Sequence, residues 1–131
     1  MTTELTVLAW GCILAIVHIF AAVRVKTRQY GTRWNMGARD EELPPPEPIV
    51  GRLARAQVNF FETFPIAAAA ILLVSITGRT DGWTAAGAIL WLAMRILYLP
   101  VYALGVPKVR TLIFLLSVAG IGLILLPVLL P

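Results

Sequence analysis

The sequence predicts an all-α integral membrane protein built as a bundle of four transmembrane helices. Hydrophobic residues make up 59% of the 131 residues, charged residues make up only 14%, and the mean hydropathy is +0.83. A soluble domain of this length needs far more polar surface than this composition supplies. Because a membrane crossing takes about 20 apolar residues, the chain has room for four helices and short loops. We therefore interpret residues 1–131 as a single membrane domain.

The first predicted span covers residues 5–23. It is too long for the core of a signal peptide, and no basic segment precedes it, so we expect it to be retained in the protein. The longest polar segment, residues 24–51, follows and is interpreted as a connecting loop. Four prolines between residues 44 and 48 favour extended backbone over helix at the end of this loop.

Two short breaks separate the other three spans. The second span, residues 52–76, begins with polar residues and continues as an apolar stretch. The segment "TGRTDG" has the glycine and aspartate content of a tight turn and leads to the third span, residues 83–104. The segment "GVPK" breaks the chain again, before an almost purely aliphatic fourth span at residues 109–130.

Basic residues are distributed unevenly between the two ends of the predicted bundle. Residues 24–55 hold seven of the eleven Lys and Arg residues, residues 105–110 hold two, and the turn between the second and third spans holds only Arg79. Because basic loops mark the cytoplasmic side, we expect the loop at residues 24–51 to be cytoplasmic and both termini to be non-cytoplasmic. The net charge of +4 lies mainly in these loops, so we expect no nucleic-acid partner.

The single cysteine and the single histidine restrict the chemistry of the chain. Cys12 alone cannot form an intramolecular disulfide, and no Cys/His spacing typical of a zinc site is present. We therefore expect no metal site and no histidine-based triad, and we interpret Cys12 as part of the core packing. For His18, we expect packing against neighbouring helices, with a role in proton handling as the alternative.

A group of polar side chains at the start of the second span is the strongest functional signal. On a helix these side chains fall within an arc of roughly 80°, so they form one stripe. The third span carries a similar stripe at spacing i, i+3, i+7, and one more arginine follows the next loop. We expect all of these groups to converge on one polar pocket. They are Arg52, Arg55, Asn59 and Glu62 of the second span, Arg95, Tyr98 and Tyr102 of the third, and Arg110.

The balance of charge in this group favours an anion as ligand. Four arginines accompany one carboxylate, so Glu62 cannot neutralise them. Because an unpaired buried arginine is costly, an external anion is the natural partner, and the guanidinium fork suits a carboxylate. Two alternatives are a purely structural salt-bridge network around Glu62, which would fix helix packing, and a proton-coupled transporter.

Two segments, "RLARAQVNFFETFP" and "RILYLPVYALGVPKVRT", resemble the MAPEG family, the membrane-associated proteins in eicosanoid and glutathione metabolism. The segment "RLARAQVNFFETFP", residues 52–65, resembles the signature of this family. The segment "RILYLPVYALGVPKVRT", residues 95–111, is similar to the third helix and the following loop of the family. The four spans and the long basic first loop also agree. Within the family, the resemblance is to leukotriene synthase and microsomal glutathione transferase members, and it indicates a bacterial inner-membrane protein.

The resemblance implies a homotrimer that binds glutathione, as co-substrate, between adjacent subunits in the cytoplasmic half of the membrane. Arg110 resembles the arginine that stabilises the glutathione thiolate in the family. Thr63 stands where the leukotriene synthase members have a tyrosine after the glutamate, so the resemblance implies that one ligand hydroxyl is rearranged or absent. The residues whose positions match those around the tripeptide are Arg52, Arg55, Asn59, Glu62, Arg95, Tyr98 and Tyr102.

These observations predict a glutathione-dependent transferase or peroxidase of the microsomal type, acting on a lipophilic electrophile that arrives through the bilayer. Glutathione carries two carboxylates and one ammonium, which the arginines and Glu62 complement. Glutathione also supplies the sulfur, so the protein needs no nucleophile of its own. The alternative is a non-catalytic trimeric membrane scaffold, or accessory subunit, that binds lipid or partner proteins.

Overall fold

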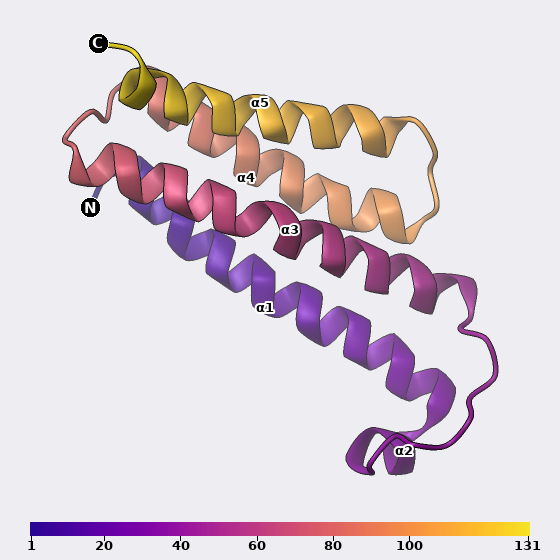
Figure 1. Cartoon of the computed structure of the whole chain (residues 1–131). Helices are drawn as coiled ribbons and strands as arrows, with labels where there is room; N and C mark the ends of the chain where they lie inside the picture. Colours follow the sequence, from indigo (N-terminus) through magenta and orange to yellow (C-terminus); the bar gives the residue numbers. More distant parts are fainter.

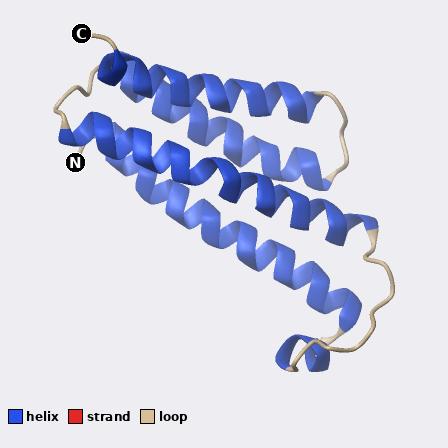
Figure 2. Ribbon diagram, viewed as in Figure 1, coloured by secondary structure: helices blue, strands red, loops and turns tan.

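A computed structural model describes all 131 residues as helices joined by loops, without β-strands (Figures 1 and 2). Each of the four long helices is long and apolar enough to cross a membrane, and neighbouring helices along the chain run in opposite directions. The prediction of an all-helical integral membrane protein with four long apolar helices is therefore confirmed. The helices are α1 (Thr3–Tyr30), the short α2 (Thr32–Met36), α3 (Pro48–Ile76), α4 (Gly82–Ala103) and α5 (Val109–Leu129).

Local sequence signals fix the ends of these helices. The side chain of Thr2 accepts a hydrogen bond from the backbone N–H of Leu5 and caps the start of α1, which ends at Gly31 with φ +96°. Helix α3 opens with Pro48, whose missing N–H costs nothing in a first turn. Helix α4 begins with a capping box between Asp81 and Thr84. Polar caps therefore set where α1 and α4 start, and a proline opens α3.

The first connecting segment differs from the sequence prediction. Residues 24–30, expected in the loop, continue α1, because lysine, arginine and glutamine are good helix formers and no breaker occurs before Gly31. Helix α2 also lies inside the predicted loop. Non-helical backbone is confined to Gly31 and residues 37–47, and Pro48 begins α3 instead of closing the loop.

Side chains at the end of α1 hold the proline-rich segment in place. Gln29 donates from its amide nitrogen to the carbonyl of Pro45 at 3.0 Å and accepts the backbone N–H of Glu47 at 2.8 Å. The hydroxyl of Tyr30 donates to the carbonyl of Pro44 at 2.9 Å. These contacts fix the point at which the chain enters α3.

The main core fills the space between α1, α3, α4 and α5 around the buried indole of Trp91. Glycines allow the helices to approach closely there, as small residues do in membrane bundles. A Cβ atom on either Gly87 or Gly120 would lie 2.6 Å from the carbonyl oxygen of the other, so α4 and α5 touch backbone to backbone. A Cβ atom on Gly11 would lie 2.9 Å from the ring of Phe64.

The histidine and the cysteine of α1 occupy different surroundings. His18 is 1% exposed, and its ring stacks on Phe60 with a centroid distance of 4.6 Å, in agreement with the expected packing role. Cys12 is exposed on the outer surface, so its interpretation as a core residue was wrong. On a helix that is apolar all round, hydrophobicity does not distinguish the face toward the core from the face toward lipid.

The up-and-down arrangement gives the bundle two distinct ends. Both termini and the turn at residues 77–81 lie at one end, and the loops at residues 37–47 and 104–108 lie at the other (Figure 1). The start of α3, the end of α4 and the start of α5 therefore meet at the second end. Most of the polar residues singled out in the sequence lie on these three segments.

Candidate functional site

Two cavities adjoin at the end of the bundle where α3 begins. The first, which we name the basic cavity, has a volume of about 330 Å³, and the second, the mixed cavity, has a volume of about 340 Å³. Arg55, Tyr102 and Arg110 line both, so these three side chains form a shared wall. They come from α3, α4 and α5 respectively, so the site forms only when these three helices pack together.

The basic cavity contains three guanidinium groups and no carboxylate. The guanidinium of Arg52 lies against Gly105, where an added Cβ atom would sit 3.0 Å from Nη1. Gly105 also has φ +71°, a conformation that favours glycine. The loop after α4 can therefore pass directly over Arg52, whose buried Nε has no hydrogen-bond partner. The cavity is lined by Pro48, Arg52, Arg55, Tyr102, Gly105, Pro107 and Arg110.

The shared wall is held together by Tyr102. Arg55 donates from Nε to the hydroxyl of Tyr102 at 3.1 Å. The guanidinium carbon of Arg110 lies 4.8 Å from the centroid of the same ring, and that of Arg55 lies 5.9 Å from it. Cation–π attraction at these distances keeps two positive charges beside one aromatic ring. Neither guanidinium is neutralised by a carboxylate of the chain in this arrangement.

The mixed cavity adds an acid and an amide to these arginines. Glu62 is exposed, and the hydrogen bond of Arg55 goes to Tyr102 rather than to Glu62. The amide oxygen of Asn59 is buried without a donor. The geometry therefore does not support the salt-bridge network around Glu62 that the sequence allowed. The cavity is lined by Ala54, Arg55, Val58, Asn59, Glu62, Tyr98, Tyr102 and Arg110.

Arg95 is the one candidate residue that lines neither cavity. It is fully buried, and its guanidinium carbon lies 4.4 Å from the ring centroid of Tyr98 and 5.4 Å from that of Phe60. None of its three nitrogens has a hydrogen-bond partner. Side chains on a helix lean toward the N-terminus, so Arg95 extends from α4 into the core, away from the site. Arg95 therefore lies behind Tyr98 instead of joining the other arginines.

Other positions also differ from what the sequence indicated. The hydroxyl of Thr63 donates to the carbonyls of Asn59 and Phe60 in its own helix, at 3.4 and 3.3 Å, and does not line a cavity. Gly105 and Pro107, which reasoning from the sequence missed, line the basic cavity. Their signal was the "GVPK" segment, which was interpreted as a break between two spans and not as part of the site.

The arrangement suits a multiply charged organic ligand better than a metal. No group of three or more His, Cys, Asp or Glu side chains could hold a metal ion. Three arginines, one glutamate and one open amide oxygen instead offer donors for carboxylates and an acceptor for an ammonium group. The tyrosine hydroxyls add donors at the boundary of the two cavities.

Four apolar helices with an arginine- and tyrosine-lined site at one end define a polytopic helical membrane protein that can bind a polar ligand. The sequence matches the model of the MAPEG family over residues 7–130, and the chain belongs to this family. A search of curated proteins found no matching relative. Family membership suggests a glutathione-related membrane enzyme.

Proposed function

We propose that the protein is a glutathione-dependent membrane transferase or peroxidase of the microsomal type, which conjugates or reduces a lipophilic electrophile. The observation that supports this function best is the shared wall of Arg55, Tyr102 and Arg110 between the two cavities. A non-catalytic scaffold, which is the alternative, has no need for an open cavity lined by unpaired guanidinium groups.

The charges of the two cavities complement those of glutathione. Arg52 and Arg55 are available for a carboxylate in the basic cavity, and the exposed carboxylate of Glu62 is available for the ammonium group. The buried amide oxygen of Asn59 lacks a donor, which an amide or ammonium N–H of the tripeptide would supply. Volumes of about 330 and 340 Å³ lie within the range of small-molecule sites, so a tripeptide that extends through both has room.

The proposed chemistry uses the sulfur of glutathione as nucleophile and Arg110 as the group that stabilises it. A thiolate attacks far more readily than a thiol, and a nearby guanidinium favours the charged form. In a conjugation, the sulfur forms a bond to the electrophilic carbon while the bond from that carbon to the leaving group breaks. Tyr98 and Tyr102 place hydroxyl donors at the same cavity wall, where they can hold the sulfur in position.

A homotrimer would complete the site. Glu62 lies on a stripe of α3 that the rest of the chain leaves exposed, together with Val58 and Ile66. A carboxylate that faces lipid is expensive, so this stripe needs a polar or protein partner. Another copy of the chain, packed against α3, would enclose Glu62 and place the glutathione site between subunits.

The proposed location is a bacterial inner membrane, with both termini non-cytoplasmic. The end of the bundle that carries the two cavities also carries most of the basic residues. Basic loops face the cytoplasm, so both cavities would open to the cytoplasmic glutathione pool. The lipophilic substrate would reach the sulfur laterally, through the bilayer.

Glutathione binding to purified variants tests the proposal. Arg55→Ala and Glu62→Gln should each weaken binding by about 1.5–3 kcal/mol, which is typical of a hydrogen bond to a charged group. Arg28→Ala is a matched control, because Arg28 is exposed near the same end and lines neither cavity. Calorimetry measures the affinity, and size-exclusion chromatography checks the assembly. Two outcomes would contradict the proposal. In the first, both variants bind glutathione as tightly as the wild type. In the second, the wild type has no measurable affinity for glutathione and the two variants lose their oligomeric assembly.

A further inference from the structure

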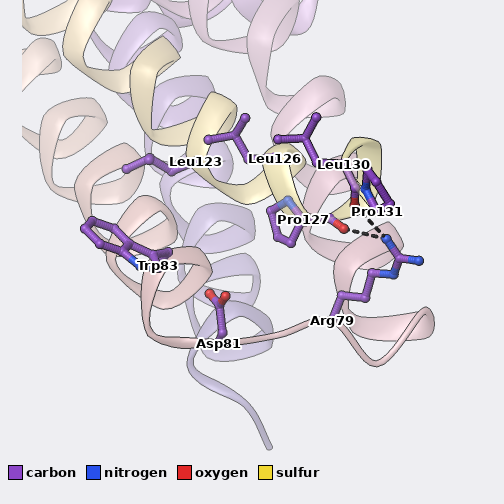
Figure 3. Close-up of a pocket in the computed structure, with 8 residues that line it drawn as sticks. All are labelled: Arg79, Asp81, Trp83, Leu123, Leu126, Pro127, Leu130 and Pro131. Carbon is purple, nitrogen blue, oxygen red and sulfur yellow. Dashed lines mark hydrogen bonds between the residues drawn. The ribbon is translucent and has the colours of Figure 1, made fainter.

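The largest cavity of the protein lies at the opposite end of the bundle from the proposed glutathione site. It has a volume of about 630 Å³ and is lined by Arg79, Asp81 and Trp83 on one side and by apolar residues of α5 and of the chain just after it, from Leu123 to Pro131, on the other (Figure 3). Its rim is charged and its α5 wall is hydrophobic. None of its residues takes part in the function proposed above.

Arg79 provides a fixed positive charge at the rim of this cavity. Its Nη1 donates to the carbonyl oxygens of Pro127 and Leu130, at 2.6 and 3.2 Å. The last carbonyls of a helix lack partners within the helix, and Arg79 satisfies two of them at the end of α5 (Figure 3). Because only Nη1 is used, the exposed guanidinium keeps Nε and Nη2 for an external acceptor.

Asp81 provides a fixed negative charge two residues further along. Its Oδ1 accepts the backbone N–H of Thr84 at 2.8 Å and caps α4, which holds the side chain in one orientation. The second carboxylate oxygen accepts no hydrogen bond from the chain and remains free. Figure 3 shows the carboxylate directed toward the space between Trp83 and Pro127. The rim therefore presents a cation and an anion that the fold itself keeps apart.

The other walls indicate a ligand that belongs to the membrane. Trp83 is 72% exposed at the start of α4. Tryptophan is common at the ends of membrane-spanning helices, because its ring prefers the boundary between lipid and water. Leu123 and Leu126 continue the wall along α5 toward the middle of the bundle. A soluble zwitterion would gain nothing from this leucine wall, whereas an acyl chain would bury against it.

We propose that this cavity binds one glycerophospholipid whose zwitterionic headgroup ends in a primary ammonium, the chemistry of phosphatidylethanolamine. The phosphate accepts hydrogen bonds from Arg79, the ammonium donates to the free oxygen of Asp81, and an acyl chain lies along the α5 leucines. A choline headgroup has no N–H to donate to Asp81. A headgroup with net negative charge would be repelled by the same carboxylate.

Two variants remove one charge each while keeping the local structure. Asp81→Asn preserves the helix cap, because asparagine and aspartate are equally good at this position. Arg79→Gln removes the positive charge and keeps an N–H donor for the α5 carbonyls. Arg28→Gln removes a cation at the far end of the bundle and is the matched control. Circular dichroism and glutathione binding should be the same for all four proteins, since none of the changes touches the glutathione site.

The assay is native mass spectrometry of protein reconstituted with equal amounts of phosphatidylethanolamine and phosphatidylglycerol and then extracted. The wild type and Arg28→Gln should retain more phosphatidylethanolamine than phosphatidylglycerol. Asp81→Asn should lower this preference by about tenfold or more, and Arg79→Gln should weaken retention of both lipids to a similar extent. Soluble glycerophosphoethanolamine, which lacks acyl chains, should not displace the lipid.

Three outcomes would overturn the proposal. The first is a wild-type protein that does not discriminate between the two headgroups, which is the behaviour of lipid bound without recognition. The second is the same preference in Asp81→Asn and Arg79→Gln as in the wild type. The third is displacement by soluble glycerophosphoethanolamine, which would show a headgroup site without a role for the leucine wall. Each can occur whether or not the protein binds glutathione, so the two proposals fail separately.

Discussion

Replacing Arg110 by alanine should abolish the activation of glutathione while leaving most of its binding intact. Arg110 lies at the shared wall, where its guanidinium carbon is 4.8 Å from the ring centroid of Tyr102. It lines both cavities, so it can approach a sulfur atom placed at their junction. Arg55, Asn59 and Glu62 would still hold the rest of the tripeptide.

The size of the effect follows from the electrostatics of the site. A free thiol has a pKa of about 8.5, so only a few per cent is thiolate at neutral pH. Two unit charges about 4 Å apart attract each other by about 4 kcal/mol at an effective dielectric constant of 20. Arg110 is only partly buried, so part of this attraction is screened. Lowering the thiol pKa by about two units takes about 2.7 kcal/mol, which one such contact can supply.

The thiolate absorbs in the ultraviolet, which gives a direct assay. Glutathione added to the wild-type protein at neutral pH should produce the thiolate band, and Arg110→Ala should remove it while calorimetry still detects binding. Arg110→Lys keeps the charge and should retain part of the signal, and Arg28→Ala should retain all of it. If bound glutathione stays a thiol in the wild type, or if Arg110→Ala keeps the band, Arg110 is not the activating group.

Two further predictions concern the membrane topology and the packing of the bundle. An alkaline phosphatase fusion at Pro131 should be active in a bacterial host and one at Met36 inactive; the reverse pattern would remove both cavities from the cytoplasm. Gly87→Ala should destabilise the protein by about 1–3 kcal/mol, because the new methyl group would lie 2.6 Å from the carbonyl oxygen of Gly120. The control Gly122→Ala, which meets nothing within 4 Å, should leave the melting temperature unchanged or higher; equal losses in both would refute the close α4–α5 contact.

The helices of the bundle could be predicted because membrane crossings need long apolar stretches, and the turns between them contain glycine, proline and aspartate. The helical continuation at residues 24–30 could not, because basic residues suit a helix end and a solvated loop equally well. Cys12 was misplaced for a related reason. Lipid-facing and core-facing positions are both apolar in a membrane helix, so the sequence does not separate them.

The candidate site was predictable where helix periodicity and the order of the helices decide which residues meet. Arg55 and Tyr102 lie on different helices, and the up-and-down connectivity brings their helix ends to the same end of the bundle. Arg95 shares a face with Tyr102 in the helical projection, yet its long side chain extends into the core. The direction of a side chain depends on packing, which spacing alone does not determine. The contact of Gly105 with Arg52 depends on the conformation of the loop after α4, so the sequence did not predict it either.

We propose that the two cavities beside α3 hold glutathione between subunits. The decisive test is an experimental structure of the purified protein with added glutathione. We expect density for the tripeptide across the shared wall of Arg55, Tyr102 and Arg110, with its ammonium near Glu62 and a second copy of the chain closing the site. Two results would contradict this proposal: cavities that remain empty at a saturating glutathione concentration, or density in which Glu62 pairs with an arginine of the protein instead of with the ligand.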